Sequence, residues 1–132
     1  ETDRTETPAG IRKIEMDAQK GILINNKHAG FLSGVNRHQE YPYIGYAASD
    51  SLQRRDAIKF KSAGFHIVRT AHHPQSEEFL KACDELGILV IEAIPGWQHW
   101  SDDKIFAQRV KNDIRQMVRR DRNHPSILTF EI

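Results

Sequence analysis

Residues 79–97, FLKACDELGILVIEAIPGW, join a helix to a strand with no linker between them, and this stretch decides the fold class. Its first part repeats apolar residues at the spacing of one helix face: Phe79, Leu80, Cys83 and Leu86. Gly87 is a natural end for that helix. Residues 88–94 are almost wholly apolar, which is typical of a parallel strand covered on both faces. The stretch therefore predicts one unit of an α/β fold.

The same alternation of strand and helix continues on both sides of this unit. Further strand-like runs are found at residues 32–36, 67–70 and 127–132. Further helical patterns cover residues 51–63 and a longer segment that ends near Arg120, with Ser101 or Asp102 as its N-cap. A βαβαβαβ order with short connections predicts a parallel sheet with its helices outside.

The first part of the chain has a different pattern. Residues 1–9 (ETDRTETPA) are polar and resemble a linker or the end of a preceding domain. Residues 11–16 alternate apolar and charged side chains, as a half-buried strand does. Residues 22–24 form a second strand that enters a turn at residues 25–27, and residues 31–32 leave that turn. We therefore expect a short β-hairpin before the parallel sheet.

The composition is that of a globular protein, with 39% apolar and 28% charged residues among 132. A formal net charge of +1 gives no electrostatic reason to expect nucleic acid as a partner. No apolar run approaches the roughly 20 residues of a membrane span, so we expect no membrane partner. The single Cys83 excludes an internal disulfide, and its place on an apolar helix face predicts a small buried hydrophobe rather than a nucleophile.

Polar and aromatic residues collect where the predicted strands end. They are Asn36, Arg37 and His38 after the first strand, Arg69, His72 and His73 at the second, and Glu92, Trp97, His99 and Trp100 at the third. Ligands of parallel α/β folds bind at the carboxyl ends of the strands. His, Asn and Arg can bind hydroxyl groups, and the apolar face of a sugar can stack on Trp. We therefore interpret this rim as a site for a polar, ring-shaped ligand such as a sugar.

Each of these residues also has an ordinary structural interpretation. His38 and His72 could satisfy nearby backbone carbonyls, and Trp97 could pack a loop. The paired histidines at residues 72–73 together with His99 suggest zinc, but no H-x-H or HExxH spacing supports a metal site, so we predict none. Arg69 lies within a strand and needs a partner, because an unpaired charge is costly there.

Four motifs occur in register along the chain: GVNRHQ (34–39), FHIVRTAHHP (65–74), the quoted stretch 79–97 and RRDRNHPSIL (119–128). Together they closely resemble the catalytic barrel of glycoside hydrolase family 2, the family of β-galactosidases, β-glucuronidases and β-mannosidases. The resemblance covers about residues 10–132 and implies an α/β fold, the (β/α)8 TIM barrel. This chain would be its truncated N-terminal half, about the first four βα units, preceded by a short β-hairpin. Residues 1–9 would be a linker or the end of a preceding immunoglobulin-like domain.

The resemblance implies retaining hydrolysis of terminal β-linked sugars by two glutamates about 5 Å apart. In the family, the acid/base belongs to an Asn-Glu pair at the end of the fourth strand, and the nucleophile lies at the end of the seventh. The chain has no Asn-Glu dipeptide, and Glu131 precedes the position where that pair is expected. We therefore assign no catalytic residue, place both glutamates beyond Ile132, and expect this fragment alone to be inactive. The apolar run 126–132, cut before its own polar end, agrees with a fragment.

The substrate-binding rim is the part of the family site that matches this chain. The residues predicted to bind substrate are His38, His72, Asn36 and Trp97, with Arg69 and Arg37 as supporting residues. His38 matches the histidine of the GVNRH motif and His72 that of an RTxHxP pattern, and both would contact sugar hydroxyls. Arg69 matches the barrel arginine that keeps the nucleophilic glutamate ionised and oriented.

The segment after the third strand departs from the family pattern. The large β-galactosidases place a magnesium-binding Glu and His there, and residues 94–100 (IPGWQHW) offer no clear equivalent. A divalent metal is compatible with the parent enzyme, but this segment does not support one, so we predict no cofactor and leave the identity of the sugar open.

Two functions fit the residues. The first is a piece of a β-galactosidase-like retaining β-glycosidase, and the alternative is a non-catalytic carbohydrate-binding or assembly module on the same fold. A metal-dependent barrel hydrolase of another family lacks the ligand spacing. An Asn-Glu pair a few residues past Ile132 would favour the enzyme. Because four strands cannot close a barrel, their open edge also predicts self-association of the fragment.

Overall fold

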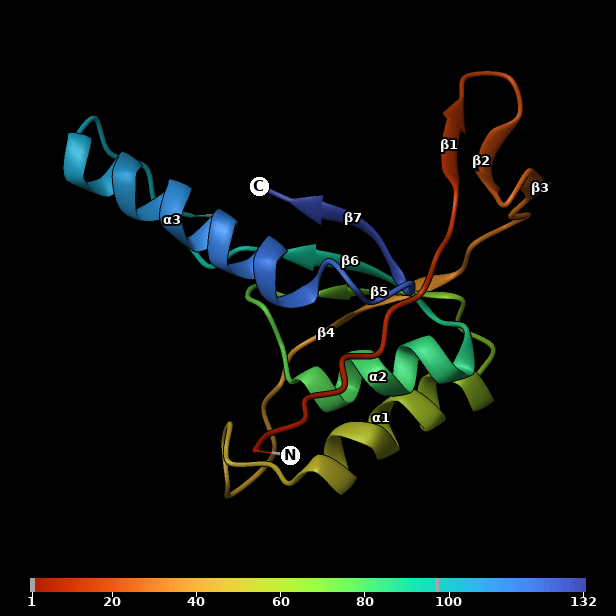
Figure 1. Cartoon of the computed structure of the whole chain (residues 1–132), viewed down its shortest axis with the longest axis horizontal. Helices are drawn as coiled ribbons and strands as arrows, with labels where there is room; N and C mark the ends of the chain where they lie inside the picture. Colours follow the sequence, from red (N-terminus) through yellow and green to blue (C-terminus); the bar gives the residue numbers. More distant parts are fainter. Residues whose placement is uncertain (1, 97) are drawn as a thin grey trace.

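The computed structural model describes residues 2–96 and 98–132. Within them, a 3-stranded sheet of order β1-β2-β3 precedes a 4-stranded sheet of order β4-β5-β6-β7 (Figure 1). The strands are β1 (Ile14–Asp17), β2 (Gly21–Ile24), β3 (Lys27–His28), β4 (Gly34–Arg37), β5 (Ile67–Thr70), β6 (Leu89–Ala93) and β7 (Ile127–Glu131). The helices are α1 (Asp50–Ser62), α2 (Glu77–Leu86) and α3 (Lys104–Asp121).

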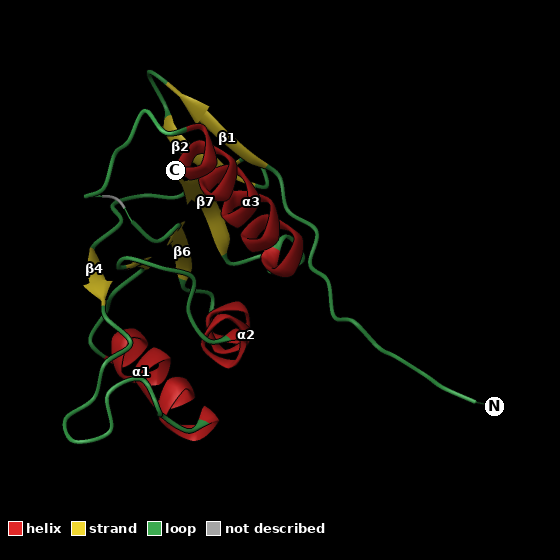
Figure 2. Ribbon diagram, turned by 90° about the vertical axis from the view of Figure 1, so that its left-hand side faces the viewer, coloured by secondary structure: helices red, strands yellow, loops and turns green. Residues whose placement is uncertain are grey.

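All neighbouring strands of the second sheet are parallel, and a helix connects each to the next. Figure 2 shows these helices along one side of the sheet. This arrangement confirms the predicted α/β class, and its strand order is that of successive βα units in a partial TIM barrel.

Alternation along the strands gives the sheet two different faces. Val68 and Val90 point to the helices, are fully buried, and form one core cluster with residues of α1 and α2. The opposite face carries a row of residues in register across β4, β5, β6 and β7: Asn36, Arg69, Ile91 and Thr129. These four side chains are exposed or only half-buried. The helix side therefore holds the core, and the other face is accessible.

The first sheet differs in one respect from the predicted hairpin. Strands β1 and β2 pair antiparallel, as expected. The turn after β2 consists of Asn25 and Asn26, which both have positive φ (52° and 64°), the backbone that a two-residue hairpin turn requires. The strand that leaves the turn is β3, not residues 31–32 as predicted, because so short a turn brings Lys27 directly opposite Ile24.

A side chain caps the N-terminus of each of the helices α2 and α3. Ser76 is the N-cap of α2 and accepts a hydrogen bond from the Glu78 backbone N–H at 3.2 Å. The prediction of Ser101 or Asp102 as the cap of α3 was wrong. Asp103 is the N-cap, and its carboxylate accepts a hydrogen bond from the Ile105 backbone N–H at 2.9 Å. Cys83 is fully buried in α2, and burial raises the pKa of its thiol to about 12, as expected of a packing residue.

Candidate functional site

A polar cluster lies on the accessible face at the carboxyl ends of the parallel strands. Its centre is an ion pair between Arg69 of β5 and Glu131 of β7. Arg69 Nε donates to Glu131 Oε2 and Arg69 Nη2 donates to Glu131 Oε1, both at 2.5 Å. Two parallel hydrogen bonds of this kind fix the orientation of both side chains.

The remaining nitrogen of Arg69 connects the cluster to its other members. Arg69 Nη1 donates to Asn36 Oδ1 at 3.3 Å and lies 3.2 Å from His72 Nδ1. The His72 and His38 rings meet edge to face, with centroids 5.4 Å apart and an interplanar angle of 81°. The structure therefore brings together four of the residues named from the sequence: Asn36, His38, Arg69 and His72.

The charges of the cluster are mutually stabilised. The hydrogen bonds from Arg69 lower the pKa of Glu131, and those to Glu131 raise the pKa of Arg69. Both groups therefore stay ionised near neutral pH. The side chains are 27% and 36% exposed, so the pair contributes little to stability and serves mainly to hold geometry.

The surroundings of His72 favour its neutral form. Desolvation, and next the positive charge of Arg69, lower its pKa. Because a guanidinium N–H can only donate, Nδ1 of the neutral ring is the acceptor toward Arg69. The ring proton is then on Nε2, which is the donor nitrogen of this tautomer.

Arg37, named with Asn36 from the sequence, points the other way. Alternation along β4 turns it toward the helices, where it is 2% exposed. Its guanidinium donates to Asp56 at 2.9 Å and to Gln75 at 2.5 Å, and its Cζ lies 4.0 Å from the centre of the Phe79 ring. Arg37 thus fixes the end of β4 to α1 and α2 and is not part of the Arg69 cluster.

Residues after β6 line a cavity at the same rim. Trp97 lies outside the described residues. Among its neighbours, Trp100 is 80% exposed. A cavity of about 360 Å³ lies beside Glu131 and is lined by Ile94, Pro95, Gly96, His99, Trp100, Phe106, Val110, Glu131 and Ile132. His99 and Trp100 therefore lie near the cluster, as their place after the third parallel strand predicts.

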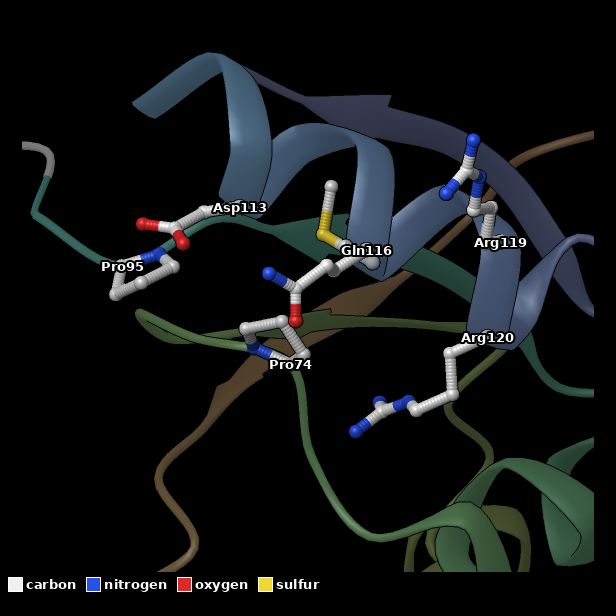
Figure 3. A pocket seen from close by; sticks show the side chains of 7 residues that line it. Pro74, Pro95, Asp113, Gln116, Arg119 and Arg120 are labelled. Atoms are coloured by element: carbon white, nitrogen blue, oxygen red, sulfur yellow. The ribbon is translucent and has the colours of Figure 1, made fainter. Parts of the chain in front are cut away.

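Glu92 of β6 was also predicted to lie at this rim, but its side chain points to the helix side of the sheet. It is fully buried between β6 and α3, with Arg120 Nη2 3.5 Å from its carboxylate. Burial, and next the charge of Asp121, raise its pKa to about 8. A cavity of about 500 Å³ lies on the same helix side, and Figure 3 shows Gln116 of α3 pointing across it toward Pro74. This buried region is separate from the Arg69 cluster.

Two further searches of residues 2–96 and 98–132 gave negative findings. No group of three or more His, Cys, Asp or Glu side chains there is arranged to hold a metal ion. Nor does any helix in that part of the chain have the length and apolar character needed to cross a membrane.

Sequence reasoning did not name Glu131 as the partner of Arg69. A charge within a strand indicated that Arg69 needs a partner, and the family resemblance suggested a glutamate beyond the chain. The partner in the structure is 62 positions away in sequence, on a strand that is not adjacent to β5. Only the strand order places the two residues together.

The fold and the cluster together define a class. Parallel strands with helices on one side and polar residues at the carboxyl ends are the wall of an α/β barrel protein with a ligand site at its rim. The profile of "Glycosyl hydrolases family 2, TIM barrel domain" matches residues 14–132. The chain belongs to this family.

Individual relatives agree with the assignment. The chain is 47% identical over 132 residues to a β-galactosidase of Thermoanaerobacterium thermosulfurigenes, covering 99% of this chain and 18% of that protein. It is 44% identical over 124 residues to a β-galactosidase of Thermoanaerobacter pseudethanolicus, covering 93% and 16%. Among solved structures, β-glucuronidase 2 of Bacteroides uniformis matches with a TM-score of 0.84 at 34% identity, covering 92% of this chain and 14% of that one. The chain thus spans less than a fifth of the length of these relatives.

Proposed function

We propose that this chain is the sugar-binding N-terminal half of the barrel of a retaining β-glycosidase that hydrolyses terminal β-linked sugars. Both catalytic glutamates would lie beyond Ile132, and residues 1–9 would link the barrel to a preceding domain. The substrate is proposed to be a β-galactoside, because the curated relatives of highest identity above are β-galactosidases.

The Arg69 cluster is the observation that carries this proposal. Asn36, His38 and His72 offer an amide and two imidazoles within one polar cluster, and Nε2–H of neutral His72 is a donor for a hydroxyl. Arg69 holds His72 and Asn36 in position while its charge is balanced by Glu131. Trp97 is proposed to stack on the apolar face of the sugar. Arg37 is proposed to act indirectly, by fixing the end of β4.

These residues would bind and orient the sugar, and they do not supply the reacting groups. Retaining hydrolysis needs one glutamate to protonate the leaving oxygen and another to attack the anomeric carbon. Glu131 is occupied by two hydrogen bonds from Arg69 and is ionised, so it is a poor proton donor. The chain by itself is therefore proposed to be inactive.

Binding and hydrolysis test the proposal separately. Methyl β-D-galactopyranoside is titrated into the isotope-labelled chain, and the His72 and Asn36 NMR signals are followed. We expect both to shift, and we expect His72→Ala to weaken binding while His28→Ala, far from the cluster, does not. Turnover of 4-nitrophenyl β-D-galactopyranoside by the chain that persists in Glu131→Gln would contradict the absence of catalytic groups.

The closed ion pair also favours a second candidate. Arg69 already has a carboxylate partner within the chain, so the cluster is complete without a catalytic glutamate. A non-catalytic carbohydrate-binding or assembly module would have the same arrangement. The reading frame after Ile132 separates the two, since an Asn-Glu pair a few residues on is required by the enzyme and not by the module.

A further inference from the structure

The loop between β4 and α1 exposes a cluster of aromatic and aliphatic side chains. We name residues 41–46 (YPYIGY) the tyrosine loop. Tyr43 is fully exposed, at 107%, and Ile44 and Tyr46 are 44% and 56% exposed. The loop follows the carboxyl end of β4, and in Figure 1 it stands clear of the sheet at the lower left. It therefore presents apolar surface at the same end of the strands as the Arg69 cluster.

The tyrosine loop is anchored to the core of the protein. Tyr41 and Gly45 exchange two backbone hydrogen bonds, of 3.0 and 2.9 Å, which close the loop as a narrow turn. The Tyr41 hydroxyl donates to Asp56 at 2.5 Å and accepts from Arg37 at 3.0 Å. Since Arg37 is almost completely buried, this contact ties the base of the loop to the interior.

Tyr43 at the tip has a backbone conformation that tyrosine rarely adopts. Its φ is 70°, in the left-handed region that favours glycine. Such strain persists where the surroundings hold the residue in place, and it collects at ligand sites. Here the paired Tyr41 and Gly45 flank the strained residue, whose ring points away from the protein. The loop therefore constrains the Tyr43 backbone and leaves its aromatic side chain fully exposed.

A ring contact connects the loop to the Arg69 cluster. Tyr46 packs edge to face on His73, with centroids 5.6 Å apart and an interplanar angle of 73°. His73 directly follows His72, which contacts both Arg69 and His38. Tyr46 thus contacts the residue that directly follows His72, and Tyr43 lies three positions away in the same closed loop.

We propose that Tyr43 and Tyr46 form a platform that binds the pyranose ring next to the terminal sugar of an oligosaccharide. This inference rests on the proposed function, because it takes the terminal sugar to lie on His38 and His72. A pyranose ring has an apolar face of C–H groups that packs on a flat tyrosine ring, and its hydroxyls can bond to the phenol groups. The Glu40 carboxylate beside the Tyr46 hydroxyl supplies a further acceptor at the edge of the platform.

A comparison of two sugars tests the platform. Methyl β-D-galactopyranoside and a β-linked disaccharide of galactose are titrated separately into the chain, and dissociation constants are measured by NMR. We expect the disaccharide to bind about tenfold more tightly, with shifts of the Tyr43 and Tyr46 ring signals. Tyr46→Ala and Tyr43→Asn should each remove most of this gain and leave the monosaccharide unaffected. Asn is chosen because it tolerates the left-handed backbone.

Phe31→Ala is the matched control, since Phe31 is 88% exposed and precedes β4 at the opposite end of the sheet. Equal dissociation constants for the disaccharide in the tyrosine variants and the unmodified chain would overturn the platform. If the monosaccharide binds through His72 but the disaccharide binds no better, the platform fails and the proposed function stands. If the tyrosine variants lose disaccharide binding while His72→Ala has no effect, the platform stands and the proposed sugar-binding role of His72 fails. Binding of neither sugar would overturn both.

Discussion

Arg69 of β5 and Glu131 of β7 form a two-point ion pair although β6 lies between their strands. The pair therefore crosses the carboxyl end of β6 and forms only when three strands are in register. It also sets the charges around His72, because the Arg69 charge lowers the pKa of His72 and the Glu131 charge raises it. One contact thus links the assembly of the sheet to the protonation of His72, which is proposed to bind the sugar.

The first prediction concerns the pKa of His72. Glu131→Gln removes the negative charge that raises this pKa, so the pKa should fall further below its ordinary value. Arg69→Gln removes a positive charge that lowers it, so the pKa should rise. Both are measured by NMR titration of the imidazole signals. His28, which lies in β3, serves as the internal control. An unchanged His72 titration in both variants would show that the pair is not formed in solution.

The second prediction concerns stability. Arg37→Met removes a buried guanidinium, which leaves Asp56 without its cationic partner and Gln53 Oε1 without its donor. Breaking a buried ion pair on one side costs about 3–5 kcal/mol, so the free energy of unfolding in urea should fall by about that amount. Arg55→Ala, an exposed change in α1 next to Asp56, should cost less than about 0.5 kcal/mol. Equal effects of the two variants would contradict the buried network.

The third prediction is a dependence of stability on pH. Burial and the charge of Asp121 raise the pKa of Glu92 from 4.5 to about 8. The folded state therefore binds this proton more tightly than the unfolded chain does. The stabilising contribution is complete below pH 4.5 and is lost as the pH rises to about 8.

Glu92→Gln removes this titration, so its free energy of unfolding should vary less between pH 5 and 8 than that of the unmodified chain. Thermal unfolding across this range provides the measurement. Asp102→Asn, an exposed change, should keep the original pH dependence. A Glu92→Gln profile parallel to the unmodified one would mean that Glu92 does not carry the proton.

The fourth prediction is self-association. In the parallel sheet, β4 and β7 each pair with a single neighbour among the described residues, so both edges have unpaired backbone groups. The accessible face also carries apolar side chains such as Ile91. Open edges pair with other chains, so light scattering should show the molar mass rising with concentration above the monomer value. A constant monomer mass up to high concentration would contradict this.

Much of the fold could be predicted because it depends on local patterns. The continuous apolar run around Glu92 and the helix stripe around Cys83 can each be recognised within about ten residues, and the order of elements then implies a parallel sheet. The errors were also local. Asp103, not Ser101 or Asp102, caps α3, because three adjacent residues offer similar capping oxygens and the local pattern does not distinguish them.

The candidate site was less predictable. Asn36 and Arg37 are neighbours in the sequence, and both looked like rim residues, but alternation along β4 sends them to opposite faces. Glu92 looked like a rim acid and is buried behind the sheet for the same reason. Successive side chains of a strand point to opposite faces of the sheet, so an error of one position in a predicted strand places a side chain on the wrong face.

The sequence by itself determined the α/β class, the family and the set of polar residues near the strand ends, because these follow from local periodicity and from short motifs. Tertiary structure alone decided that Glu131 pairs with Arg69, that Arg37 belongs to the core, and that the tyrosine loop lies beside His73. These contacts join residues far apart in the chain, and their distances depend on strand order and register, which local sequence patterns do not encode.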